Sequence, residues 1–101
     1  MLASMNDRLH TIYQHDPNIV SRSIAGEMIL VPIRQHVGDL ENIYTLNETG
    51  ARIWELIDGQ RSLSAVHQQM VLEYEIDPAQ AEQDLLELVD SLLQNGALEE
   101  V

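Results

Sequence analysis

The fold is indicated most clearly by residues 44–59, which read YTLNETGARIWELIDG. Here a short strand passes directly into a helix, because Asn47 carries the side-chain oxygen of an N-cap and Glu48 suits the positive end of the helix dipole. The apolar residues that follow recur at helical spacing: Ile53, Trp54 and Ile57. Gly59 supplies the left-handed residue that ends many helices, so we predict a helix at about 47–58.

Two further helices are predicted downstream. The first starts near Ser62 or Ser64 and ends near Tyr74, and its buried stripe consists of Leu63, Val66, Met70 and Tyr74. The second begins after Asp77, an N-cap followed by proline, and ends before Gly96. Its apolar face is formed by Ala81, Leu85, Leu88, Val89 and Leu92, and is widened by Leu86 and Leu93.

Three short strands are predicted before these helices. Residues 19–25 and 27–33 favour a hairpin, residues 34–42 a polar loop, and residues 43–46 a third strand. Pro32 cannot donate to a ladder, so its end of the second strand should lie at an edge or bulge. The sequence therefore predicts an α+β, winged-helix-like domain, in which a small three-stranded antiparallel sheet is followed by a three-helix bundle.

The charge distribution limits the kinds of partner. The net charge is −12, with five arginines and no lysine, and about −10 of it falls after residue 47. Nucleic-acid binding is disfavoured, because phosphate contacts depend on Lys and Arg. A peptide or protein with some positive charge is the better electrostatic match.

Neither end of the chain is expected to form a helix of more than one turn. Residues 1–16 read as a flexible extension, with one amphipathic turn as the alternative (Leu9, Ile12 and Tyr13), and residues 17–101 as the domain. Exchange of this extension between protomers, giving a homodimer, stays open. Residues 97–101 suggest a short extended tail. The absence of cysteine, of a signal peptide and of a membrane span fits a cytoplasmic protein.

Catalytic constellations are not recognisable in this sequence. The histidines lack metal-ligand spacing: His10, His15, His36 and His67. His67 lies beside a core stripe, where a packing or capping role is expected. The carboxylates of the last helix read as a solvated acidic face: Glu82, Asp84, Glu87 and Asp90. We therefore expect no enzyme, no metal and no cofactor.

A peptide groove is the more coherent hypothesis. A short strand at residues 43–46 can expose an unpaired backbone edge to which an extended peptide adds. The last helix is apolar on a broad front that includes Leu85, Leu86, Val89 and Leu93. Most of this front is expected to be core, and a front this broad leaves room for part of it to contact a ligand instead. The alternative is that the N-terminal extension covers the edge.

The same stretches resemble the PqqD family. The resemblance rests on 46–51 (LNETGA) and 53–59 (IWELIDG), then on Ser62-Leu63-Ser64, Asp77-Pro78, Asp84-Leu85-Leu86 and Asn95-Gly96-Ala97-Leu98. It covers roughly residues 19–101. Such proteins, also called RiPP recognition elements, are small winged-helix-type domains that bind the leader of a ribosomally made precursor peptide. They deliver it to a modifying enzyme, often a radical SAM protein.

The resemblance also implies a site. The leader would add beside the third strand and lie against the third helix. By position this implicates Asn42, Ile43, Tyr44, Thr45 and Leu46 on the strand, and Glu82, Leu85, Leu86 and Val89 on the helix. The pathway stays open between a quinone cofactor, a lasso peptide and another cluster. The rival interpretations are a winged-helix transcriptional regulator, a general protein-interaction module and, least favoured, a small enzyme.

Overall fold

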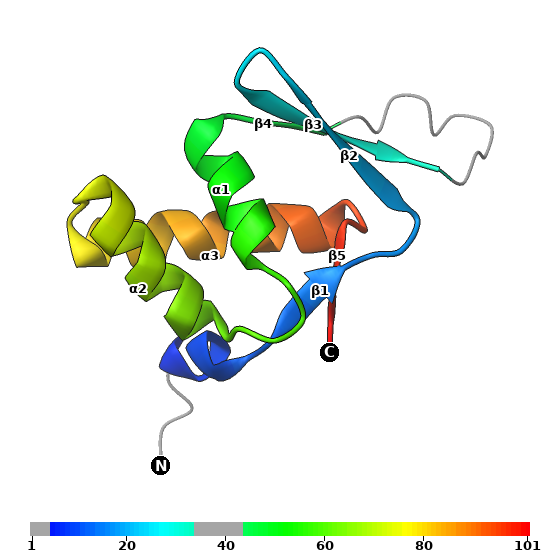
Figure 1. Cartoon of the computed structure of the whole chain (residues 1–101). Coiled ribbons are helices and arrows are strands. Elements are labelled where there is room, and N and C mark those ends of the chain that lie inside the picture. The colour runs from blue at the N-terminus through cyan, green and yellow to red at the C-terminus, as the bar shows by residue number, and fades with distance from the viewer. Residues whose placement is uncertain (1–4, 34–43) are drawn as a thin grey trace.

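The computed structural model describes residues 5–33 and 44–101 (Figure 1). Within these ranges an antiparallel sheet precedes three helices, as the sequence predicts, and two short strands near the termini form a second, smaller sheet. The elements in chain order are η1 (Met5–His10), β1 (Tyr13–His15), β2 (Ile19–Ile24), β3 (Glu27–Pro32), β4 (Tyr44–Leu46), α1 (Glu48–Leu56), α2 (Leu63–Tyr74), α3 (Pro78–Gln94) and β5 (Leu98–Glu100). The predicted loop at 34–42 lies outside the described residues.

The larger sheet has the strand order β2-β3-β4, and both pairings are antiparallel. A two-residue turn joins β2 to β3, with Ala25 and Gly26 both at positive φ (52° and 85°), as the primed turns of two-residue hairpins require. The predicted hairpin is therefore confirmed. Pro32 ends β3 opposite Ile19, beyond the three residues of β3 that pair with β4.

Each helix begins at a predicted cap. The cap side chains accept hydrogen bonds from backbone N–H groups three residues on: Gly50 to Asn47 (2.9 Å), Ala65 to Ser62 (3.3 Å) and Gln80 to Asp77 (3.0 Å). Gly59 and Gly96 adopt positive φ after α1 and α3, as expected from glycines that follow helices. Among the described helices, none is long and apolar enough to cross a membrane.

The core lies where the three helices meet one face of the larger sheet (Figure 1). α3 runs through its centre, and Leu85, Val89 and Leu92 are 1% exposed or less. α1 contacts β3 and β4 of the sheet as well as α2, and contributes Ile53, Trp54 and Leu56 to the core. The sheet contributes its inward side chains: Met28, Leu30 and Leu46. Most residues of the predicted helical stripes therefore form the core, and Tyr74, Leu86, Leu88 and Leu93 are only partly buried at its margin.

The N-terminal segment differs from the expected flexible extension. β1 pairs antiparallel with β5, and Tyr13 is only 6% exposed. The ring of His15 stacks on Trp54 with centroids 3.7 Å apart, and His15 Nε2 donates to the Trp54 carbonyl oxygen at 2.7 Å. Residues 5–16 are therefore packed as part of the domain, because β1 completes a ladder with the C-terminal residues and covers α1.

Candidate peptide-binding site at the edge of β4

β4 forms one edge of the larger sheet among the described strands, with β3 on its inner side (Figure 1). The alternative that the N-terminal segment covers this edge is not what the structure shows for residues 5–16, which pair with β5 and contact α2. An edge strand presents backbone N–H and C=O groups to whatever approaches it. The β4 edge therefore has the property that strand addition requires.

The register identifies which β4 groups point outward. The Ile33 N–H donates to the Asn18 carbonyl oxygen at 2.7 Å, so hydrogen-bonded pairs between β2 and β3 fall on odd-numbered β3 residues. The even-numbered β3 residues then bond toward β4, where they oppose Tyr44 and Leu46. Thr45 lies in the alternate pairing with Ile29, and its N–H and C=O point away from β3 toward the outer edge.

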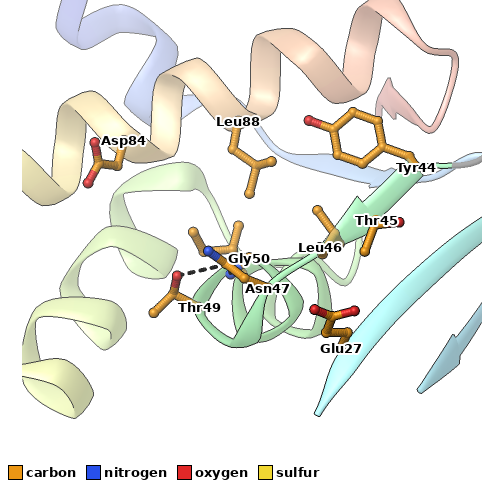
Figure 2. Close-up of a pocket in the computed structure, with 10 residues that line it drawn as sticks. Glu27, Tyr44, Thr45, Leu46, Asn47, Thr49, Gly50, Asp84 and Leu88 are labelled. Atoms are coloured by element: carbon orange, nitrogen blue, oxygen red, sulfur yellow. Dashed lines mark hydrogen bonds between the residues drawn. The ribbon is translucent and has the colours of Figure 1, made fainter. Parts of the chain in front are cut away.

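A hollow of about 480 Å³ adjoins this edge, between β4, the start of α1 and α3 (Figure 2). We call it the β4 hollow. Its lining residues come from four elements and the cap of α1: Glu27, Tyr44, Thr45, Leu46, Asn47, Thr49, Gly50, Ile53, Asp84 and Leu88. Leu88 points from α3 toward the first turn of α1, and Glu27 lies on the opposite side, from β3.

The β4 hollow combines apolar and acidic groups. Leu46 and Ile53 are buried and Leu88 is partly buried, while Glu27 and Asp84 are exposed carboxylates. Gly50 sits at the first turn of α1, where a Cβ atom would lie 3.2 Å from Asn47 Oδ1 and 3.4 Å from Leu46. A side chain at this position would crowd the cap and narrow the hollow. A ligand at this site could form backbone hydrogen bonds with β4, contact an apolar surface and approach two carboxylates.

The strand half of the predicted site lies together in the structure. Tyr44, Thr45 and Leu46 all line the β4 hollow. Asn42 and Ile43 lie outside the described residues, so their part in the site stays a prediction.

The helix half of the predicted site is placed differently. Leu85 and Val89 are buried in the core, and Leu85 reaches only a neighbouring hollow beside α2. Glu82 and Leu86 line a separate hollow on another side of α3, together with Arg8 and Asp90. The α3 residues that face β4 are Asp84 and Leu88.

The shift on α3 has a simple geometric origin. Asp84 and Leu88 are four residues apart and precede Leu85 and Val89 by one, so they form the adjacent stripe of the helix. In the sequence, the pattern that could have identified these residues is a carboxylate and a leucine four residues apart, next to a fully apolar stripe. The sequence prediction instead assigned Leu88 to the core and Asp84 to a solvated face.

The sequence also raised the questions of the role of His67 and of a metal site, both outside the β4 hollow. His67 Nε2 donates to the Pro78 carbonyl oxygen at 2.8 Å, which confirms its expected packing or capping role at the start of α3. Within residues 5–33 and 44–101, no group of three or more His, Cys, Asp or Glu side chains is arranged to hold a metal ion.

The sequence is similar to that of a family named for coenzyme synthesis and to that of several PqqA binding proteins. The family model described as coenzyme PQQ synthesis protein D (PqqD) matches residues 27–98. A PqqA binding protein of Methylococcus capsulatus is 39% identical over 60% of this chain and 63% of its own length. One of Xanthomonas euvesicatoria is 34% identical over 57% and 63%. The match thus spans less than two thirds of these relatives.

Two solved structures share the fold. A lasso peptide synthetase B1 complexed with the leader peptide has a TM-score of 0.73 and 30% identity, over 86% of this chain and 96% of that one. TbiB1 in complex with the TbiA(beta) leader peptide has a TM-score of 0.72 and 23% identity, over 85% and 94%. Because the family model covers more than half of the 101 residues, the chain belongs to the PqqD family.

Proposed function

We propose that this protein binds the leader of a ribosomally synthesised precursor peptide by strand addition to the outer edge of β4, and presents it to a modifying enzyme. The observation that carries the proposal is the juxtaposition of the outward Thr45 backbone with the β4 hollow. Main-chain hydrogen bonds along the edge would provide affinity, and the hollow would select one or more side chains of the peptide.

The similar proteins support this function. Two relatives carry the name PqqA binding protein, and both structural neighbours hold a leader peptide. The structural neighbour at 30% identity is matched over nearly its whole length, so the present chain contains the equivalent of that entire domain.

The charges around the β4 hollow indicate what kind of leader fits. Glu27 and Asp84 line the hollow, and the described residues of its lining include no Lys, Arg or His. A leader segment with an apolar residue for the Leu46–Leu88 side and a basic residue within reach of Asp84 is therefore favoured. The protein acts as a non-enzymatic chaperone, and the modifying enzyme, of the radical SAM type, supplies the chemistry.

A titration of the ¹⁵N-labelled protein with the unlabelled leader of its precursor tests the proposal. Amide shifts should concentrate at Thr45, Gly50 and Leu88, around the β4 hollow. The matched control is a leader with the same composition in scrambled order, which keeps the charge but loses the sequence. Shifts confined to α2, β1 and β5 would contradict the proposed site.

A further inference from the structure

The two faces of the larger sheet differ from those of an ordinary half-buried sheet. Met28 and Leu30 point inward and are 8% and 1% exposed. The opposite face, which we call the outer sheet face, carries Val20, Arg22, Ile24, Glu27, Ile29, Val31 and Thr45, as the cross-strand register shows. Four of these seven residues are β-branched and apolar, although no described helix or strand covers this face (Figure 1).

β2 inverts the usual pattern. Antiparallel sheets with one wet face place apolar residues inward and polar residues outward. In β2 the inward positions include Ser21 and Ser23, whereas Val20 and Ile24 point outward and are 38% and 54% exposed. An exposed apolar cluster of this kind marks an interaction surface.

A second copy of the chain is a poor occupant of this surface. Each copy carries a net charge of −12, so two copies repel each other. Arg22 lies halfway along β2, the edge strand opposite β4, is exposed, and makes no ion pair with another described residue. A partner with a carboxylate facing Arg22 would neutralise this charge on docking.

The outer sheet face is continuous with the peptide edge. Arg22, Ile29 and Thr45 form one cross-strand row that ends at the outer edge of β4. A strand added there would extend the row, so alternate side chains of the peptide would point to the same face. A protein lying on this face would contact the chain and the bound peptide together.

We infer that the outer sheet face is the docking surface for the enzyme that modifies the bound peptide. This inference rests on the proposed function. The chemistry that fits is an apolar surface on the enzyme with a carboxylate positioned to pair with Arg22. Docking on this face leaves the β4 hollow to the peptide, and Val20, Arg22 and Ile24 lie on β2, the strand farthest from that hollow, so substitutions there separate enzyme binding from peptide binding.

The test separates these two interactions with surface substitutions. The probe is the purified radical SAM-type enzyme that modifies the precursor, titrated with and without saturating leader. The variants are Val20→Ser/Ile24→Ser and Arg22→Glu, and the matched control is Leu72→Ser, which removes an apolar side chain that is 75% exposed on α2. Circular dichroism checks that each variant is folded.

Both outer-face variants should weaken enzyme binding by about tenfold or more, while leader affinity and the Leu72→Ser control stay at the wild-type level. Unchanged enzyme affinity in both variants, or no binding of the enzyme to the wild-type chain with leader present, would overturn the inference. So would sedimentation showing a wild-type dimer that Val20→Ser/Ile24→Ser dissociates. Failure of the wild type to bind leader would instead reject the proposed function, because that affinity is measured separately.

Discussion

Replacement of Thr45 by proline is the most informative perturbation of the proposed site. Proline removes the backbone N–H that points away from β3. It does not remove a hydrogen bond of the β3–β4 ladder, because the bonding residues on β4 are Tyr44 and Leu46. Proline is tolerated on an edge strand at such positions, so the fold should survive.

The expected loss of affinity follows from that single donor. A bound leader would lose one main-chain hydrogen bond, and its carbonyl group would be left without a partner at a partly dehydrated edge. An unsatisfied group of this kind costs about 1–3 kcal/mol, which corresponds to a rise in Kd of about 5- to 150-fold.

The assay is isothermal titration of the leader into the wild type, Thr45→Pro and Thr45→Val. Valine keeps the N–H and the β-branched shape, so its Kd should stay close to that of the wild type. Thermal unfolding, followed by the fluorescence of Trp54, confirms that the variants are folded. A folded Thr45→Pro variant that binds the leader as tightly as the wild type would refute strand addition at this edge.

Three further predictions concern stability, each measured as the urea unfolding midpoint. Arg52 donates two hydrogen bonds to Glu73 (2.7 and 2.8 Å), which lower the pKa of Glu73 from 4.5 to about 2. Because the pKa of Glu73 is lower in the folded than in the unfolded state, Glu73→Gln should destabilise the protein above pH 4.5. The difference in stability between wild type and variant should shrink as the pH falls toward 2, and a difference that does not shrink would contradict the coupling of Glu73 to Arg52. Asn47→Ala should cost about 1 kcal/mol through the lost cap of α1, whereas an unchanged midpoint would show that the cap is dispensable. Leu92→Ala should cost about 2–5 kcal/mol because its side chain is fully buried, against less than about 0.5 kcal/mol for the exposed Leu72→Ala, and similar costs would contradict the assigned core.

The parts of the fold that local signals determine were predictable from the sequence. Asn47, Ser62 and Asp77 cap the three helices in the structure as their side chains suggest. The turn at Ala25 and Gly26 likewise sets the β2–β3 hairpin. In each case the interaction that fixes the element lies within a few residues.

The N-terminal strand could not be predicted in this way. β1 has only three residues, two of them polar, and its partner β5 lies more than 80 residues later in the chain. β1 is held in place by the burial of Tyr13 in the core and by the stacking of His15 on Trp54. No local pattern in the sequence encodes such a distant pairing.

The candidate site was predictable on its strand side and less so on its helix side. The edge strand was expected because a short strand follows a predicted loop, and its residues were indicated by the resemblance to the PqqD family; Tyr44, Thr45 and Leu46 line the β4 hollow. On α3, apolar residues occupy several adjacent stripes, so periodicity alone does not tell which stripe faces the core. The burial of Leu85, Val89 and Leu92 in the core and the packing of α3 against α2 decide this, and they leave Asp84 and Leu88 facing β4.

The most direct test of strand addition is amide hydrogen exchange at Thr45, measured by NMR with and without saturating leader. The Tyr44 and Leu46 amides, which point toward β3, serve as internal references. The account predicts that Thr45 exchanges fast in the free protein and becomes strongly protected when the leader binds. Full occupancy of the leader with no added protection at Thr45 would contradict it.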